Sequence, residues 1–419
     1  MAYQYVCGLM QAPRSNITQI AETVVNSSYE RLQHFISHSP WSATAVEQQI
    51  AQDTVTAFAT LKGETALLID EFSVRKQGNA SVGVARQYLG CEGKVENGQV
   101  AVLATLAREH YTGIVRTRLF LPDEWTDDRK RLDAAGVPEE ARTFRTKPEL
   151  AAEMIAALAG EGITFDFHNA DALYGHSTSY RRTIDPLCPY IVFVHCNQTI
   201  YLCDPKPSVP ERRSEKGPAP SLRKTSAFSQ RVDEFAREPT RSAWQRITYH
   251  QGSKGAHTRE VLTKQVWTWD GQEQAAVQER LVISRKVGGG DIQYSLSNDR
   301  EGLLSPHRLL VRQMSRAKVE RSIRDSKQEL GMVQYQVRSW QAWEHHSALT
   351  LLALLFLTEE RIANKRAAPL LSCADVRDIL CRLLPSTNND PKAIDRIIAE
   401  RHERRARDIA RWKAITSSA

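Results

Sequence analysis

The feature that most constrains the fold is a series of strand-like segments that passes into an alternation of helix and strand. The strand-like segments are short and apolar, and polar, glycine-bearing turns separate the first three, so we expect an antiparallel meander there. The expected elements are strands at 65–69, 99–107, 113–121, 163–167 and 190–194, and helices at 147–158 and 174–183. Strand, strand, strand, helix, strand, helix, strand makes one α/β unit, which is the fold class that we predict.

The segments on either side of this unit have a different character. Two helices are expected within the first sixty residues. Residues 204–241 are rich in Pro, Ser, Lys and Arg and predict an extended or partly disordered basic loop. Residues 244–296 return to a strand-like pattern and predict a β-rich insertion, and from residue 305 the pattern is helical. A last basic helix is expected at 395–413.

The composition is that of a globular protein with a mild excess of positive charge. The 419 residues include 56 Lys and Arg against 49 Asp and Glu, and this net charge of +7 permits a polyanionic partner. Seven cysteines without a C-x-x-C pair predict reduced thiols and a cytoplasmic location. The longest apolar run, 348–357, is shorter than the ~20 residues that a membrane span needs, so no membrane association is expected.

Carboxylates stand at the ends of two predicted strands. Asp70 and Glu71 follow the apolar run 66–69, and Asp171 lies just past the strand expected at 163–167. If these two strands are neighbours, Asp70 and Asp171 meet at one edge of the sheet, where they repel each other unless a cation binds between them. Magnesium suits such a site because it prefers hard oxygen ligands and leaves positions open for phosphate.

A third carboxylate is expected from a later helix. In the segment 314–327, Arg316, Glu320, Arg324 and Lys327 fall on one helical stripe. A single carboxylate among cations suits a nuclease helix, with Glu320 for metal and the cations for DNA phosphates. An exposed face with i,i+4 salt bridges explains the helix taken alone, and the combination with Asp70 and Asp171 favours the metal site.

The same residues resemble a known family. Arg316, Glu320 and Lys327 match the R-x3-E-x6-K part of the Y-x2-R-x3-E-x6-K signature of DDE-type transposases of bacterial insertion sequences. Residues 69–100 resemble the first-aspartate block of one branch of these enzymes. N-A-D-A-L-Y-G at 169–175 and Y-Q-V-R-S-W at 335–340 resemble the segments around the second aspartate and after the glutamate helix. The resemblance extends from about residue 25 to residue 357.

This resemblance implies a fold, an activity and a catalytic triad. It implies an RNase H-like catalytic domain interrupted by a β-rich insertion, with Asp70, Asp171 and Glu320 as catalytic residues and metal ligands. The signature tyrosine is replaced by Gln313, and no departure from the family pattern removes a carboxylate. Asp166 and Glu329 are the alternative assignments.

The implied domain organisation has five parts. They are a helical DNA-binding region (1–62), the first part of the catalytic domain (63–203), the basic loop and β-rich insertion (204–300), the glutamate helix and the helix after it (301–357), and a basic helical C-terminal region (358–419).

The implied reaction is cut-and-paste DNA transposition in a bacterial cytoplasm. Two Mg²⁺ ions, for which Mn²⁺ can substitute, assist hydrolysis at the element's terminal inverted repeats, and the freed 3′-hydroxyl then attacks target DNA. A homodimer on paired ends is expected because one triad serves one end. The expected DNA contacts are Arg75, Lys76, Arg86, Arg316, Arg324, Lys327, Trp244, Trp267 and Trp269. Two alternatives stay open: a domesticated sequence-specific DNA-binding protein, and an RNase H-like nuclease without strand transfer.

Overall fold

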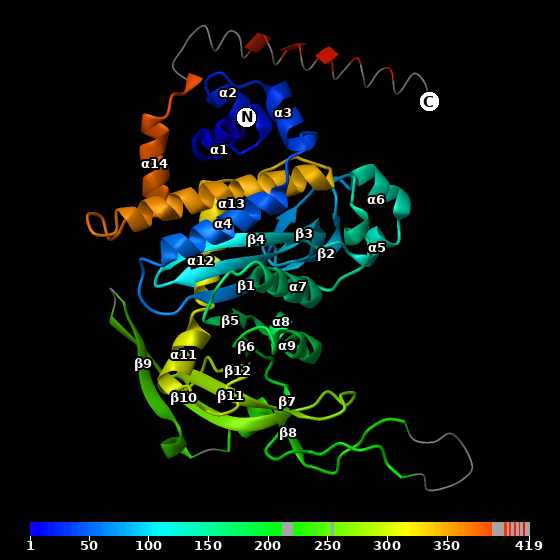
Figure 1. Cartoon of the computed structure of the whole chain (residues 1–419), viewed down its shortest axis with the longest axis vertical. Helices are drawn as coiled ribbons and strands as arrows, with labels where there is room; N and C mark the ends of the chain where they lie inside the picture. Colours follow the sequence, from blue (N-terminus) through cyan, green and yellow to red (C-terminus); the bar gives the residue numbers. More distant parts are fainter. Residues whose placement is uncertain are drawn as a thin grey trace.

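The computed structural model describes residues 1–211, 221–238, 240–252 and 255–387, with isolated positions between 398 and 414. The described part is elongated, with a helical end, a mixed sheet in the middle and a second sheet at the other end (Figure 1). The helices are α1 (Ala2–Gln11), α2 (Ile17–Thr23), α3 (Tyr29–Ser37), α4 (Ala43–Phe58), α5 (Asp123–Thr126), α6 (Arg129–Ala135), α7 (Lys147–Gly160), α8 (Ala172–Gly175), α9 (Thr178–Ile184), α10 (Val232–Phe235), α11 (Pro306–Met314), α12 (Ala317–Glu329), α13 (Trp340–Ala363) and α14 (Cys373–Leu383). The strands are β1 (Ala66–Arg75), β2 (Ala85–Leu89), β3 (Lys94–Arg108), β4 (Tyr111–Leu119), β5 (Phe167–Ala170), β6 (Ile191–Phe193), β7 (Thr199–Tyr201), β8 (Ser229–Arg231), β9 (Gln245–Gly252), β10 (Gly255–Thr268), β11 (Val277–Lys286) and β12 (Gln293–Ser297).

The first sheet has the order β2-β3-β1-β5, and β4 also pairs with β3. β1 and β4 are both antiparallel to β3, as the sequence predicts, while β5 lies parallel to β1. The last pair between β1 and β5 joins Ile69 to Ala170. Asp70 is the next residue of β1 and Asp171 directly follows β5, so the prediction that these two residues lie at neighbouring strands is confirmed.

Several predicted boundaries are wrong. β1 does not end at Asp70 but continues to Arg75, because β3 is long enough to pair with it as far as Gly98. The strand expected at 163–167 lies at Phe167–Ala170 instead, where it can pair with β1. The helix expected at 174–183 is split into α8 and α9, because the Ser177 side chain caps the start of α9.

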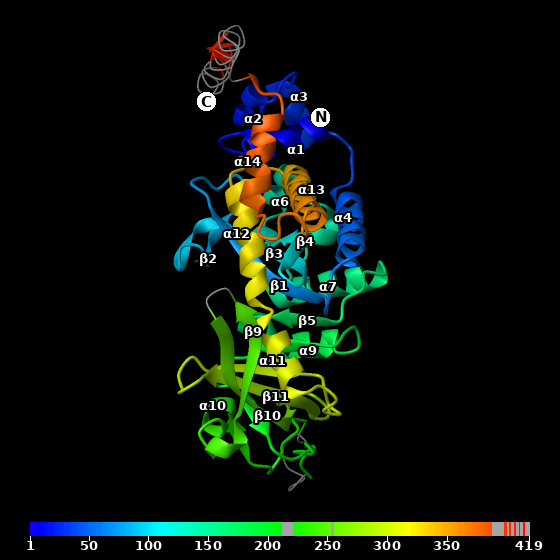
Figure 2. The same ribbon diagram turned by 90° about the vertical axis from the view of Figure 1, so that its left-hand side faces the viewer.

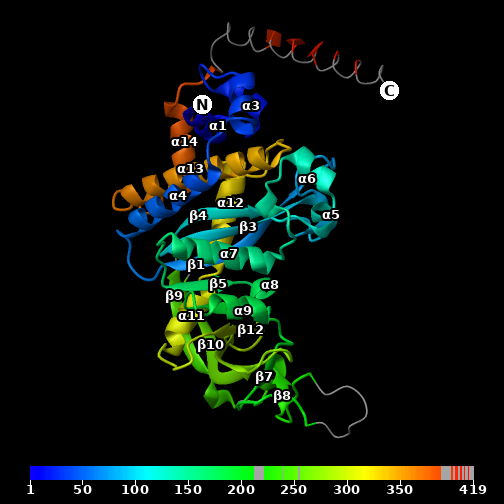
Figure 3. The same cartoon turned by 45° about the vertical axis from the view of Figure 1, so that its right-hand side comes forward.

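Helices cover both faces and one edge of the first sheet. Leu67 and Ile69 of β1 pack in one core with Leu158 of α7. Leu68 belongs to a second core with Val319 of α12. Figure 3 shows α7 in front of the strands and α12 behind them. Helices α4 and α13 pack against the edge strand β4. None of the described helices is long and apolar enough to cross a bilayer.

The second sheet has the order β6-β12-β11-β10-β7-β8, and β9 also pairs with β10. It is joined to the first sheet through β6, because Tyr190 forms a parallel bridge with His168 of β5. Within the predicted basic loop, the described residues include β8 and α10, and residues 212–220 and 239 lie outside the described residues. Most of the basic helix expected at 395–413 also lies outside them.

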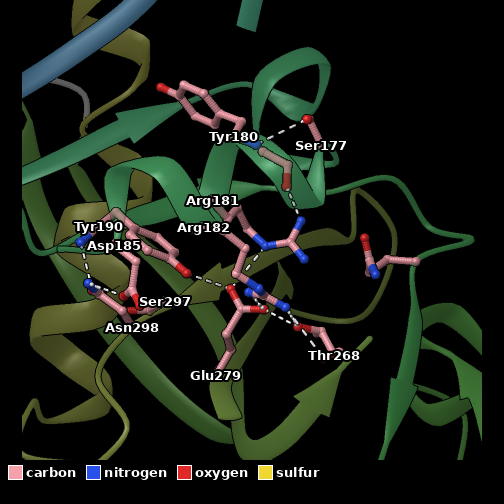
Figure 4. Close-up of polar contacts among 12 residues, drawn as sticks. Ser177, Tyr180, Arg181, Arg182, Asp185, Tyr190, Thr268, Glu279, Ser297 and Asn298 are labelled. Atoms are coloured by element: carbon pink, nitrogen blue, oxygen red, sulfur yellow. Dashed lines mark hydrogen bonds and ion pairs between the residues drawn. The ribbon is translucent and has the colours of Figure 1, made fainter. Parts of the chain in front are cut away.

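A buried polar network fixes the junction between α9 and the second sheet (Figure 4). The Glu279 carboxylate of β11 accepts hydrogen bonds from Arg181 at 3.0 Å, from Arg182 at 3.3 Å and from the Tyr190 hydroxyl at 2.6 Å. The Thr268 hydroxyl of β10 also donates to it. Because the Arg181 and Glu279 side chains have no exposed surface, this ion pair is fully desolvated.

Candidate active site

Asp70 and Glu71 point to opposite faces of the first sheet, because successive side chains on a strand alternate. Asp70 lies on the α12 side and is 8% exposed. Glu71 lies on the α7 side, where its carboxylate pairs with the Lys147 ammonium at 2.7 Å. Only one of the two consecutive carboxylates therefore faces the helix that carries Glu320.

Asp171 directly follows β5 and caps α8. One carboxylate oxygen accepts a hydrogen bond from the backbone N–H of Leu173 at 2.9 Å, and the other faces Arg316. The backbone bond fixes the direction of this carboxylate, so that its second oxygen is presented to the same space as Asp70.

Arg316 is the residue on which the three predicted carboxylates converge. It lies at the break between α11 and α12, where it occupies the N-cap position of α12. One guanidinium nitrogen lies 3.2 Å from Asp70 and 3.7 Å from Asp171, and the other lies 3.1 Å from Glu320. Figure 2 shows α12 running along the molecule past β1 and β3, which places its first turn beside the ends of the paired strands.

A cavity of about 520 Å³ opens beside this cluster. Asp171, Arg316 and Glu320 line one side of it, and Phe193 and Tyr294 line it from the second sheet. The Asp171 and Glu320 carboxylates are therefore accessible from a space bordered by both sheets, which is large enough to admit part of a polymeric substrate.

Burial changes the acid–base properties of two groups here. Burial raises the pKa of Asp70 to about 6, although the Arg316 charge acts in the opposite direction. Burial also raises the pKa of Tyr174, with the nearby charges of Glu71, Asp171 and Asp70 adding to the effect. The Tyr174 hydroxyl is buried without a hydrogen-bond partner, and only its place in the motif at 169–175 could have indicated it from the sequence.

The two alternative carboxylates have other partners. An Asp166 side-chain oxygen accepts the backbone N–H of Thr65 at 2.7 Å. Glu329 pairs with Arg377 of α14 at 3.2 Å. Both contacts tie chain segments together, and neither residue lines the cavity beside Arg316.

The cations predicted to bind DNA lie in different environments. Arg75, Arg86 and Arg324 are exposed. Lys76 is half-buried: its ammonium lies 3.8 Å from the centre of the Tyr335 ring and donates to the Tyr335 carbonyl at 3.0 Å. Burial lowers the pKa of Lys327, and the nearby Cys91 and Asp70 oppose that shift.

The three predicted tryptophans lie on the second sheet, away from the carboxylates. Trp244 is buried in the core of that sheet, with the Arg285 guanidinium 3.8 Å from its ring. Trp267 and Trp269 are half-buried, and the Trp269 indole donates to the Glu273 carbonyl at 3.0 Å. None of the three is among the residues that line the cavity.

Comparison with known proteins identifies the family. Residues 1–256 match the model of the DDE superfamily endonucleases, which is more than half of the chain. The chain belongs to the DDE superfamily endonucleases. The matched segment contains Asp70 and Asp171 and ends before α12, so the placement of Glu320 rests on the geometry around Arg316.

One curated relative of this DDE endonuclease agrees with the family match. The chain is 32% identical over 201 residues to a probable transposase for insertion sequence element IS701 from Microchaete diplosiphon. The match covers 47% of this chain and 49% of the relative, so the chain spans about half the length of that curated relative. A piggyBac transposase synaptic complex with hairpin DNA aligns with a TM-score of 0.38 and 11% identity, over 88% of this chain and 67% of that one.

The site supplies the kind of oxygen donor that a divalent ion prefers, although these oxygens are not arranged to hold an ion directly. Asp70, Asp171 and Glu320 present hard carboxylate oxygens toward a single cationic group, the Arg316 guanidinium. Over the described ranges, no group of three or more His, Cys, Asp or Glu side chains is arranged to hold a metal ion directly. The Arg316 guanidinium occupies the space between the three carboxylates.

Proposed function

We propose that this DDE endonuclease is a transposase that cleaves the ends of an insertion sequence and joins them to target DNA. One observation carries the proposal. Asp70, Asp171 and Glu320, from three segments far apart in sequence, meet around one cation beside an accessible cavity. Buried or clustered carboxylates are costly to hold together, so their convergence favours a catalytic use.

A divalent metal ion is the cofactor expected of a DDE endonuclease. We propose that Asp70, Asp171 and Glu320 hold Mg²⁺, as two ions, with Mn²⁺ able to substitute. When bound, such ions activate the attacking oxygen and stabilise the leaving one. A pKa of about 6 leaves Asp70 mostly ionised above pH 7, as a metal ligand must be. Asp171 is held in direction by its bond to the Leu173 N–H.

The arrangement of the first sheet supports an RNase H-like catalytic domain. Its core has three antiparallel strands with β5 parallel to β1, and β6 bridges to β5 at its far side. The other strands of the second sheet, β7 to β12, lie between β6 and α11 in the chain, where the β-rich insertion is proposed to lie. In this assignment, residues 63–203 and 301–357 form the catalytic domain.

The proposed partners are the element's terminal repeats and a target duplex. Exposed Arg75, Arg86 and Arg324 are available to phosphates, which supply affinity without sequence preference. Sequence recognition is assigned to the helices of residues 1–62 and to the insertion, whose opposite positions along the molecule would allow long contacts with DNA (Figure 1). A homodimer on two paired ends completes the proposal, because two ends need two active sites.

A strand-transfer assay tests this function. The protein is incubated with Mg²⁺, a donor plasmid that carries the gene's flanking terminal repeats, and a target plasmid. The proposal predicts cleavage at both ends and insertion into the target, both lost in Glu320→Ala. Cleavage without insertion would indicate a nuclease, and binding without cleavage would indicate a DNA-binding protein.

A further inference from the structure

The single positive charge of Arg316 is shared among all three carboxylates. Its guanidinium reaches Asp70, Asp171 and Glu320 at 3.2, 3.7 and 3.1 Å. Three negative charges so close together repel one another unless a cation lies between them. Lys147 does not serve this purpose, because it pairs with Glu71 on the other face of the sheet. In the DNA-free protein the guanidinium is therefore the counterion of the site.

Two features of the same guanidinium favour its movement out of this position. Its Nε is buried without a hydrogen-bond partner, so the present arrangement does not satisfy the whole group. The side chain is 22% exposed and lines the cavity of about 520 Å³, which gives it space to rotate. A guanidinium forms strong paired hydrogen bonds with phosphate as well as with carboxylate. A phosphate in the cavity would offer the buried Nε the partner that it lacks.

We propose that Arg316 is a displaceable counterion that holds the metal site closed until a DNA phosphate enters the cavity. The phosphate draws the guanidinium away, and the freed oxygens of Asp70, Asp171 and Glu320 then bind the divalent ion. Arg316 and the ion compete for the same oxygens, so the free protein binds the ion weakly. This inference rests on the proposed function, because it requires these carboxylates to be metal ligands.

Binding of Mn²⁺ to the DNA-free protein tests the inference without any cleavage. Free Mn²⁺ is measured by electron paramagnetic resonance while Mn²⁺ is titrated into wild type and Arg316→Ala. We expect Arg316→Ala to bind Mn²⁺ at least tenfold more tightly. Arg321→Ala is the matched control, because it removes the same charge from the next turn of α12, where Arg321 pairs with Asp325. Its Mn²⁺ affinity should stay within twofold of wild type.

Three further variants separate the failure of this inference from failure of the proposed function. Adding Asp171→Ala to Arg316→Ala should abolish the gain, which places the ion at the carboxylates. Arg316→Gln removes the charge but keeps a polar side chain, and should also gain affinity if Arg316→Ala does not fold. Equal Mn²⁺ affinity in wild type, Arg316→Ala and Arg316→Gln, with loss in Asp171→Ala, would overturn the counterion role and leave the metal site standing. Affinity unchanged by Asp171→Ala would overturn both.

Discussion

Removing the Glu279 carboxylate is expected to destabilise the junction between the two sheets more than any surface change. Both Glu279 and Arg181 have 0% exposed side chains, and Arg182 also pairs with this carboxylate. In Glu279→Ala, Arg181 keeps its bond to the Gly175 carbonyl at 2.7 Å but loses its counter-charge. Breaking one partner of a buried pair costs about 3–5 kcal/mol, and we expect a loss of that size in the free energy of unfolding.

Urea unfolding followed by tryptophan fluorescence measures this loss, because Trp267 and Trp269 flank Thr268 at the network. Arg129→Ala is the control, since Arg129 and Glu139 form an exposed pair with 76% and 73% of their side chains accessible, and its unfolding midpoint should not move. Replacing both partners with apolar residues, as in Arg181→Met with Glu279→Leu, should recover most of the loss. A Glu279→Ala protein within about 1 kcal/mol of wild type would refute the reasoning.

The pH dependence of this network has a definite sign. Burial alone would raise the pKa of Glu279, but Arg181 and Arg182 outweigh it and hold the pKa below its usual value of 4.5. A carboxyl with a depressed folded pKa stabilises the fold fully above the unfolded pKa. The difference in unfolding free energy between wild type and Glu279→Ala should therefore shrink as the pH falls below 4.5.

Three further predictions follow from the described contacts. Burial raises the pKa of Glu344 from 4.5 to about 7, so the folded protein loses stability as the pH rises through this window. Glu344→Gln should therefore be more stable than wild type at pH 8 by up to about 3 kcal/mol, but not at pH 4. Equal stability of the two proteins at pH 8 would contradict this prediction. Arg324→Ala and Lys327→Ala should each reduce the slope of log affinity for end DNA against log salt by about one, whereas an unchanged slope would assign both to the protein's own surface. Mass determination with end duplex should find two protomers and two ends, and a complex of one protomer that cleaves both ends would refute the dimer.

The sequence predicted the neighbouring positions of Asp70 and Asp171 because the alternation of strands and helices makes β1 and β5 adjacent. It placed the end of β1 wrongly, because Asp70 looks like a terminus and only the length of β3 shows that pairing continues to Arg75. The short strand β2, with the sequence ARQYL, shows no apolar alternation that would have predicted it. Local apolar periodicity predicts where a strand lies, but how far the strand remains paired depends on the length of its partner strand.

The sequence alone does not predict which residues surround an individual Lys or Arg side chain. Arg316 and Glu320 are four apart on a helix, and their contact was predictable. The contact of Arg316 with Asp70 joins residues 246 positions apart, and no local pattern encodes it. The sequence predicts that Lys76 contacts DNA phosphate, and it contains no sign that the Lys76 ammonium packs on Tyr335, 259 positions away. Contacts of this kind depend on how α12 and the segment after it pack across the finished sheet.

Nicking of end DNA by Asp171→Ala and Asp166→Asn, compared with wild type in Mg²⁺, tests the central claim most directly. Asp171 faces the shared cation beside the cavity, while Asp166 is held by the Thr65 N–H. The account predicts no detectable nicking by Asp171→Ala, with duplex binding retained, and nicking near the wild-type rate by Asp166→Asn. Nicking at the wild-type rate by Asp171→Ala, with loss in Asp166→Asn, would contradict it.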